Sequence, residues 1–217
     1  MDELREAAFC PTGRKQGDVA AAVIHIVGGA LAAAGLPVLV VGAAAERAAA
    51  LVVGFSLYGA SLLYYFAIST LAHFLEAPGA RRVFATLDEA GDFFLIAGSW
   101  TPLCLTVFKG PLGWALFGVL WGLALFDFLV ALLYTSRAKN LVLAAYYLGV
   151  TLVLPLVAPF RGLLGEILFA WLVLAGLLYA AGLLFRSRDE MPYHHGIWHA
   201  FTLAASICHF FGLLSLL

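Results

Sequence analysis

The last segment of the chain, residues 194–217, reads HHGIWHAFTLAASICHFFGLLSLL. It is long enough to cross a bilayer as a helix, which takes about 20 mostly apolar residues. His195 and His199 are four residues apart, so both imidazoles lie on one face of that helix, about 5–6 Å from each other. Two histidines on one helix face can bind a transition metal. The segment therefore predicts a membrane helix that carries part of a metal site.

The whole chain shares this apolar character. Of its 217 residues, 64% are hydrophobic and 12% are charged, whereas soluble domains carry about 25% charged residues. We therefore expect an all-α polytopic membrane protein. The net charge of −1 gives no indication of a nucleic-acid partner, and the three widely separated cysteines predict no disulfide framework.

Short charged breaks divide the chain into seven apolar segments that are each long enough to span the membrane. These segments are 19–43, 48–75, 82–108, 112–133, 140–159, 162–185 and 194–217. Residues 1–17 form a polar N-terminal arm, and we expect no cleavable signal peptide before the first apolar segment. Residues 18–217 are expected to form a single domain of seven transmembrane helices.

Basic residues are divided unequally between the two sides of these seven segments. Nine lie in the N-terminal arm and in every second loop, namely Arg5, Arg14, Lys15, Arg81, Arg82, Arg137, Lys139, Arg186 and Arg188. The other side carries only Arg47, Lys109 and Arg161. Because cytoplasmic loops are enriched in Lys and Arg, we expect the N-terminus in the cytoplasm and the C-terminus outside.

With this topology, ionisable residues from five predicted helices fall at one depth, in the cytoplasmic half of the membrane. They are His25, His73, Asp88, Asp92, Asp127, His195 and His199. The outer half carries only Glu166 and His209. Ionisable side chains inside a membrane face a cavity, a partner or an ion, so this clustering predicts a polar site near the inner surface.

A zinc site is the hypothesis that these residues support best. His73, His195 and His199 would supply three nitrogen ligands and leave a fourth position for water, as in catalytic zinc sites. Asp88 would orient that water and accept its proton. Ser69 precedes His73 by four residues, so it shares the same helix face and is expected at the site. Iron, nickel or cobalt would fit similar ligands.

Simpler interpretations stay open for several of these residues. A pair of histidines at this spacing also suits helix packing or pH sensing. Asp88 suits a position near a helix start, where the helix dipole favours a carboxylate, and Asp92 suits a partner for a histidine. His25 fits a hydrogen bond between helices better than a metal ligand. Asp127 is expected to pair with a basic residue of the following loop, such as Arg137 or Lys139.

Several blocks of the sequence resemble the hemolysin III family. The blocks are Ser69-Thr70-Leu71-Ala72-His73, residues 87–91 and 96–102, His195 to His199, residues 208–211, and Asp18 with His25 and Gly28. That family groups with the progestin and adipoQ receptors and with alkaline ceramidases in a proposed superfamily of membrane hydrolases. The resemblance covers residues 18–212, and the order and spacing of the blocks together make it specific.

The resemblance implies a seven-helix protein with a zinc ion on its cytoplasmic side. The implied ligands are His73, His195 and His199, with Asp88 holding a water molecule at the metal. The sequence departs from the family pattern at Ala22, Ala72 and Glu89, where relatives often have asparagine, an aromatic residue and histidine. None of these departures falls on an expected ligand. We expect them to affect the contacts around the ligands and the substrate preference.

Three functions are compatible with this sequence. The first is an intramembrane zinc hydrolase that cleaves a lipid amide or ester, with a membrane lipid as substrate or ligand. The second is a receptor-like sensor in which zinc is structural. The third is a cytolysin or pore, which is less favoured because a pore lining needs polar residues through the full depth of the membrane. We expect a multi-pass protein of a bacterial inner membrane, and the sequence predicts no oligomeric state.

Overall fold

The computed structural model of the protein describes residues 16–133 and 160–217, except residues 187 and 189. The elements in this part of the chain are α2 (Gln16–Ala45), α3 (Ala49–Phe74), α4 (Pro78–Thr106), α5 (Gly110–Leu133), α7 (Arg161–Leu164), α8 (Glu166–Arg186) and α9 (His194–Leu214). No strand occurs within these ranges. The expected all-α class is therefore confirmed for the described residues.

Five of these helices are long and apolar enough to cross a membrane, namely α2 from Val19, α3, α5 as far as Val130, α8 and α9. They correspond to five of the seven predicted spans. Helix α4 covers the predicted span 82–108 but is not among the five, and its N-terminal half carries several charged residues. The predicted span 140–159 lies outside the described residues. The count of seven spans and the side of each terminus therefore stay predictions.

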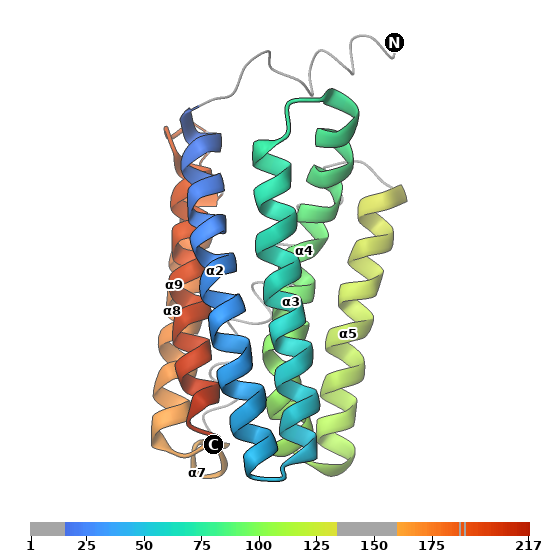
Figure 1. Ribbon diagram of the computed structural model, residues 1–217, viewed down its shortest axis with the longest axis vertical. Coiled ribbons are helices and arrows are strands. Elements are labelled where there is room, and N and C mark those ends of the chain that lie inside the picture. The colour runs from blue at the N-terminus through green and yellow to red at the C-terminus, as the bar shows by residue number, and fades with distance from the viewer. Residues whose placement is uncertain (1–15, 134–159, 187, 189) are drawn as a thin grey trace.

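The long helices lie side by side and alternate in direction (Figure 1). Helix α3 packs against α2 and α4, α4 packs against α5, and α9 packs against both α8 and α2. The starts of α2, α4 and α9 meet the ends of α3, α5 and α8 at the top of Figure 1. Residues near these termini are therefore brought to one end of the bundle from helices that are distant in the sequence.

Local backbone signals set where the helices at this end begin. Pro78 occupies the first turn of α4, where proline loses no hydrogen bond because the first N–H groups of a helix have no partner within it. Tyr193 adopts a left-handed conformation, with φ of 62°, immediately before α9. That residue reverses the chain direction, so that His195 and His199 lie in the first two turns of α9.

Helices α3 and α9 are the innermost of the candidate membrane spans. Half of the residues in their apolar segments are buried, compared with 22% in α2 and in α5. Apolar side chains of α2 and α5, such as Val41 and Phe126, are more than half exposed, as expected for helices that face lipid. These two candidate spans also carry Ser69, His73, His195 and His199.

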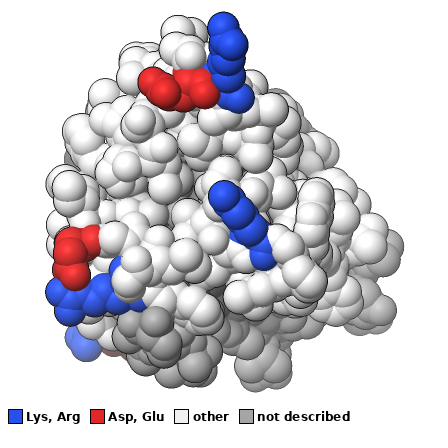
Figure 2. Space-filling model, turned by 90° about the horizontal axis from the view of Figure 1, so that it is seen from below, with Lys and Arg blue, Asp and Glu red and all other residues white. Residues whose placement is uncertain are grey.

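Figure 2 shows the opposite end of the bundle, where the few charged side chains lie in small separate groups on an otherwise uncharged face. Arg161 of α7 donates two hydrogen bonds through Nε to the Glu166 carboxylate, at 2.9 and 3.0 Å. These bonds raise the pKa of Arg161, but the pair is exposed and solvent screens it. The buried charged groups described below belong to the other end of the bundle.

Close contact between α3 and α4 depends on a glycine. A Cβ atom added at Gly54 would lie 2.8 Å from the backbone Cα of Pro102, which cannot move aside, whereas one at Gly122 on α5 would meet nothing within 4 Å. We expect Gly54→Ala to lower stability by about 1–3 kcal/mol through overpacking, or by about 2–10 °C in Tm. Gly122→Ala is the matched control and should not lower Tm. Equal melting temperatures in detergent would contradict this contact.

Candidate metal centre

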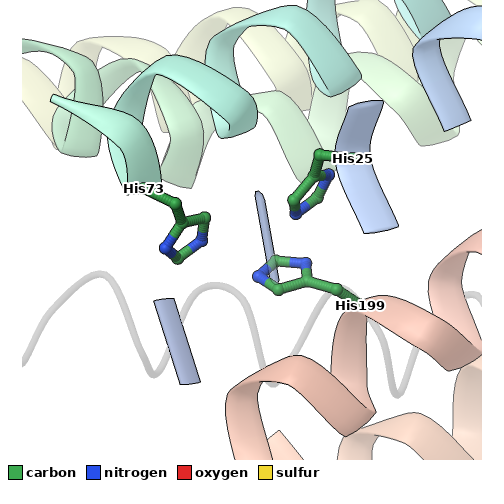
Figure 3. Close-up of side chains that lie close together, drawn as sticks. All are labelled: His25, His73 and His199. Carbon is green, nitrogen blue, oxygen red and sulfur yellow. The ribbon is translucent and has the colours of Figure 1, made fainter. Parts of the chain in front are cut away.

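Four histidines from three helices meet at the end of the bundle that is uppermost in Figure 1. They are His25 of α2, His73 of α3, and His195 and His199 of α9. The His199 ring centre lies 4.1 Å from that of His25, 4.3 Å from that of His195 and 5.4 Å from that of His73. Figure 3 shows the rings of His25, His73 and His199 converging on one another. We call these four residues the histidine cluster.

Three members of the histidine cluster form a donor set suited to a metal ion. His25, His73 and His199 each offer a ring nitrogen, and these three atoms lie within 4.8 Å of one another. His25 is 1% exposed, and neither of its ring nitrogens has a hydrogen-bond partner among the described residues. Leaving a buried polar atom unsatisfied is costly, and a bound cation would satisfy it.

The fourth histidine adds a second geometric indication. The Nε2 atoms of His195 and His199 face each other at 2.9 Å. Two nitrogen ligands of one tetrahedral zinc ion, each bonded at about 2.0–2.1 Å, lie about 3.3 Å apart. The rings of His195 and His73 are also neighbours, with centres 5.1 Å apart. The three sequence-predicted ligands are therefore neighbours, but the donor group within 4.8 Å contains His25 in place of His195.

The structure changes the interpretation of His25. We expected this residue to form a hydrogen bond between helices, but it forms none within the described part of the chain, and it packs against the other histidines instead. That expectation was wrong. The depth of His25 in the first predicted span was the signal that could have placed it in the cluster.

Tyr65 is a residue that the sequence did not single out. Its hydroxyl lies 3.2 Å from Nδ1 of His199, and both residues are buried. A hydrogen bond at Nδ1 fixes the ring orientation and leaves Nε2 free to face a metal ion. Tyr65 precedes Ser69 and His73 on α3 at intervals of four residues, so all three share a helix face. That spacing is the sequence signal that could have identified it.

The predicted pair Ser69 and Asp88 lies beside the histidine cluster. The Ser69 hydroxyl donates a hydrogen bond to Oδ1 of Asp88, which links α3 to α4. Helix α4 begins at Pro78, so Asp88 lies about 15 Å along the helix axis from its start. A helix dipole acts within the first turn. The alternative interpretation of Asp88 as a helix-start residue was therefore wrong.

Asp92 and Arg186 form a second polar contact at the site. Their closest atoms, Oδ2 and Nη1, lie 3.5 Å apart, and the Asp92 side chain is 5% exposed. The Arg186 guanidinium also lies over the ring of Trp198, 5.4 Å from its centre. Arg186 is thus held from two sides at the end of α8. A histidine was one of the partners expected for Asp92, and the ion pair that the structure shows is with an arginine.

A cavity of about 260 Å³ opens beside these groups. It is lined by Ala72, His73, Arg81, Ala85, Asp88, Asp92, Arg186, His195 and His199. The cavity therefore connects the two α9 histidines with both carboxylates and with two arginines. This arrangement could hold a cation on its nitrogen donors, place a water molecule near a carboxylate, and leave room for part of a substrate.

An apolar hollow of about 350 Å³ lies further along α2, α3 and α9. Its walls include Gly28, Gly35, Phe66 and Phe210. Phe66 also packs against His25, with ring centres 5.8 Å apart. An apolar space that faces the lipid therefore ends at a side chain in contact with the histidine cluster.

Two other polar residues from the sequence analysis lie away from the cluster. His209 is buried, and its Nε2 donates a hydrogen bond to the carbonyl oxygen of Ser99 at 3.0 Å. Asp127 is buried in α5, and its expected partners, Arg137 and Lys139, lie outside the described residues.

Comparison with known proteins identifies the family. A family profile described as "Haemolysin-III related" matches residues 14–210. The chain belongs to the hemolysin III family. This confirms the resemblance noted from the sequence blocks and makes the protein an integral, multi-pass membrane protein.

Members of the hemolysin III family are similar to this chain along most of its length. Hemolysin-3 of Bacillus cereus is 32% identical over 197 residues, which cover 91% of this chain and 90% of the relative. A hemolysin-3 homolog of Bacillus subtilis (strain 168) is also 32% identical, over 91% of this chain and 92% of its own length. The human monocyte to macrophage differentiation factor is 26% identical, over 72% of this chain and 67% of its own length.

Proposed function

We propose that this hemolysin III family protein is a zinc-dependent intramembrane hydrolase of lipid amide or ester bonds. The observation that carries the proposal is a polar cavity that places three members of the histidine cluster, His73, His195 and His199, next to Asp88 within a bundle of apolar helices. Three histidines and a carboxylate around an open space are the groups of a catalytic rather than a structural zinc site.

In this proposal His73, His195 and His199 hold the zinc ion, and His25 packs edge-on against His199 as the fourth histidine of the site. Zinc bound there would polarise a substrate carbonyl group and lower the pKa of a bound water molecule to about 7. Tyr65 fixes the orientation of His199 through its bond to Nδ1. Zinc is the metal of this proposal because three histidine ligands with an open fourth position are typical of catalytic zinc sites.

In this proposal Asp88 accepts a proton from water, and Ser69 positions the Asp88 carboxylate. The carboxylate of Asp88 lines the cavity and accepts a proton from water during attack on the carbonyl carbon. The Ser69 hydroxyl donates to Oδ1 of that carboxylate, which links the carboxylate to α3 and limits its rotation at the cavity wall. A positioned base of this kind contributes about 10²–10⁴-fold to a rate.

The substrate would come from the bilayer that surrounds the apolar helices. The hollow that ends at Phe66 offers space for an acyl chain alongside the histidine cluster. Because two similar proteins come from Bacillus species, we place the protein in a bacterial plasma membrane. The excess of basic residues in the N-terminal arm and in every second loop of the predicted topology supports a cytoplasmic N-terminus and a cytoplasmic-side zinc ion.

The two other functions make different predictions. A sensor with structural zinc requires a closed, fully coordinated ion, whereas the cavity of about 260 Å³ beside the histidines favours an accessible one. A pore requires a polar path from end to end, whereas the residues that line this cavity come from one end of the bundle. The hydrolase is therefore the function that the geometry supports best.

Removal of the metal tests the proposal. We expect the purified protein to contain zinc by elemental analysis and to release fatty acid from a lipid amide or ester. A chelator should abolish that turnover because the histidines alone cannot polarise the carbonyl, and added zinc should restore it. Zinc that only raises Tm, without any metal-dependent turnover across amide and ester lipids, would indicate the structural role. Current in planar bilayers without turnover would indicate the pore.

A further inference from the structure

The cavity beside the histidine cluster carries two arginines that the proposed hydrolysis does not use. Arg81 lies in the first turns of α4 and Arg186 at the end of α8, and both line the cavity. Arg82, the next residue along α4, is exposed and does not line it. Of these two adjacent arginines, Arg81 therefore lines the cavity and Arg82 does not.

The charges around the cavity favour an anionic ligand once a metal ion is bound. Arg81 and Arg186 balance Asp88 and Asp92, so with neutral histidines the lining has no net formal charge. A divalent cation adds two positive charges in a partly buried space. A ligand with one or two negative charges would offset this excess. Its electrostatic attraction to these charges would be stronger in the partly buried cavity than in bulk water, because the local dielectric constant is lower.

The size and position of the cavity indicate which part of a ligand it holds. Pockets that enclose a whole drug-sized molecule measure about 300–1,000 Å³, and this one measures about 260 Å³. It lies where the membrane helices end, the depth at which lipid headgroups lie and where basic pockets between helices bind them. Ala72 and Ala85 leave space there because their side chains are small.

We propose that Arg81 and Arg186 form a subsite for the phosphate of an anionic membrane lipid, so that the hydrolase prefers anionic lipids as substrates. The planar guanidinium group matches a phosphate with two parallel hydrogen bonds. Arg186 is already oriented by Asp92 and Trp198, and Arg81 approaches the same cavity from α4. The claim that the bound lipid is a substrate rests on the proposed function, but binding of the lipid can be measured without turnover.

The test compares two neighbouring arginine variants in zinc-loaded protein. Binding of phosphatidylglycerol and of a neutral diacylglycerol is measured by native mass spectrometry, with inorganic phosphate as a competitor. We expect a preference for phosphatidylglycerol, which Arg81→Gln reduces about tenfold, because it removes one charged hydrogen-bond donor. Arg82→Gln should change the affinity less than twofold.

Other outcomes would overturn the subsite. Equal losses in the Arg81 and Arg82 variants would indicate general surface attraction, and equal binding of the neutral lipid would contradict the charge argument. Displacement of the lipid by millimolar inorganic phosphate would indicate a site for the free ion. A phosphatidylglycerol preference in a protein without metal-dependent turnover would overturn the proposed function and leave the subsite in place. Metal-dependent turnover without a preference for phosphatidylglycerol would support the proposed function and overturn the subsite.

Discussion

Replacement of His199 by alanine should remove the metal from the protein. His199, like His73, lies in ring contact with all three other members of the histidine cluster, so its loss takes away a ligand and a central ring of the cluster. Zinc binding by four protein ligands is worth about 10–16 kcal/mol. One ligand therefore contributes about 3 kcal/mol, which lowers the affinity more than a hundredfold. Elemental analysis of purified protein should find zinc in the wild type and almost none in the variant.

His209→Ala is the matched control for this experiment. His209 lies on the same helix and is equally buried, but it bonds to the carbonyl of Ser99 rather than to the cluster. We expect this variant to be less stable and to keep its zinc. Retention of zinc by the His199 variant, or an equal loss in both variants, would disprove the assignment of the metal centre.

Replacement of Asp88 by asparagine should separate metal binding from turnover. The change keeps the size of the side chain and a carbonyl oxygen that can accept the Ser69 hydrogen bond, but it removes the base. We expect kcat for lipid hydrolysis to fall about 10²–10⁴-fold, with the zinc content unchanged.

Asp127→Asn provides the comparison for Asp88, because Asp127 is a buried carboxylate in the neighbouring helix α5 but does not line the cavity, whereas Asp88 is half-buried and lines it. Its kcat should remain close to that of the wild type. Full turnover in the Asp88 variant would contradict the role of Asp88 as the base. Loss of zinc from that variant would instead make Asp88 a determinant of metal binding.

The sequence predicted most of the described fold because helix length and apolarity carry the signal. Spans such as 19–43 and 48–75 match α2 and α3 within a few residues. Helix α4 shows where this signal weakens. Arg81, Asp88 and Asp92 of this helix line a polar cavity inside the bundle, so its composition resembles that of a soluble helix although it lies between α3 and α5. Hydropathy measures the average of a segment and cannot show which face is enclosed.

The site was predicted less completely, because depth along a helix can be read from sequence but rotation about its axis cannot. His73, Asp88, His195 and His199 were expected at one depth and do lie near the same cavity. His25 was assigned a different role because nothing in its own segment shows that it faces α9 rather than lipid. The choice of Arg186 as the partner of Asp92 depends on how α8 packs, which the sequence does not reveal.

Helix α9 packs against α8 and α2. Two of its buried histidines also form hydrogen bonds with the helices across the bundle, His199 with Tyr65 of α3 and His209 with Ser99 of α4. The hairpin of α8 and α9 is thus joined to α3 and α4 by hydrogen bonds as well as by apolar packing in a shared core. A divalent ion shared by His73 and the α9 histidines would add a covalent-like link between α3 and α9. Release of the ion should make the contact between the α8–α9 hairpin and the rest of the bundle the first to open. This opening would be measured as faster amide hydrogen exchange in α9 than in α3.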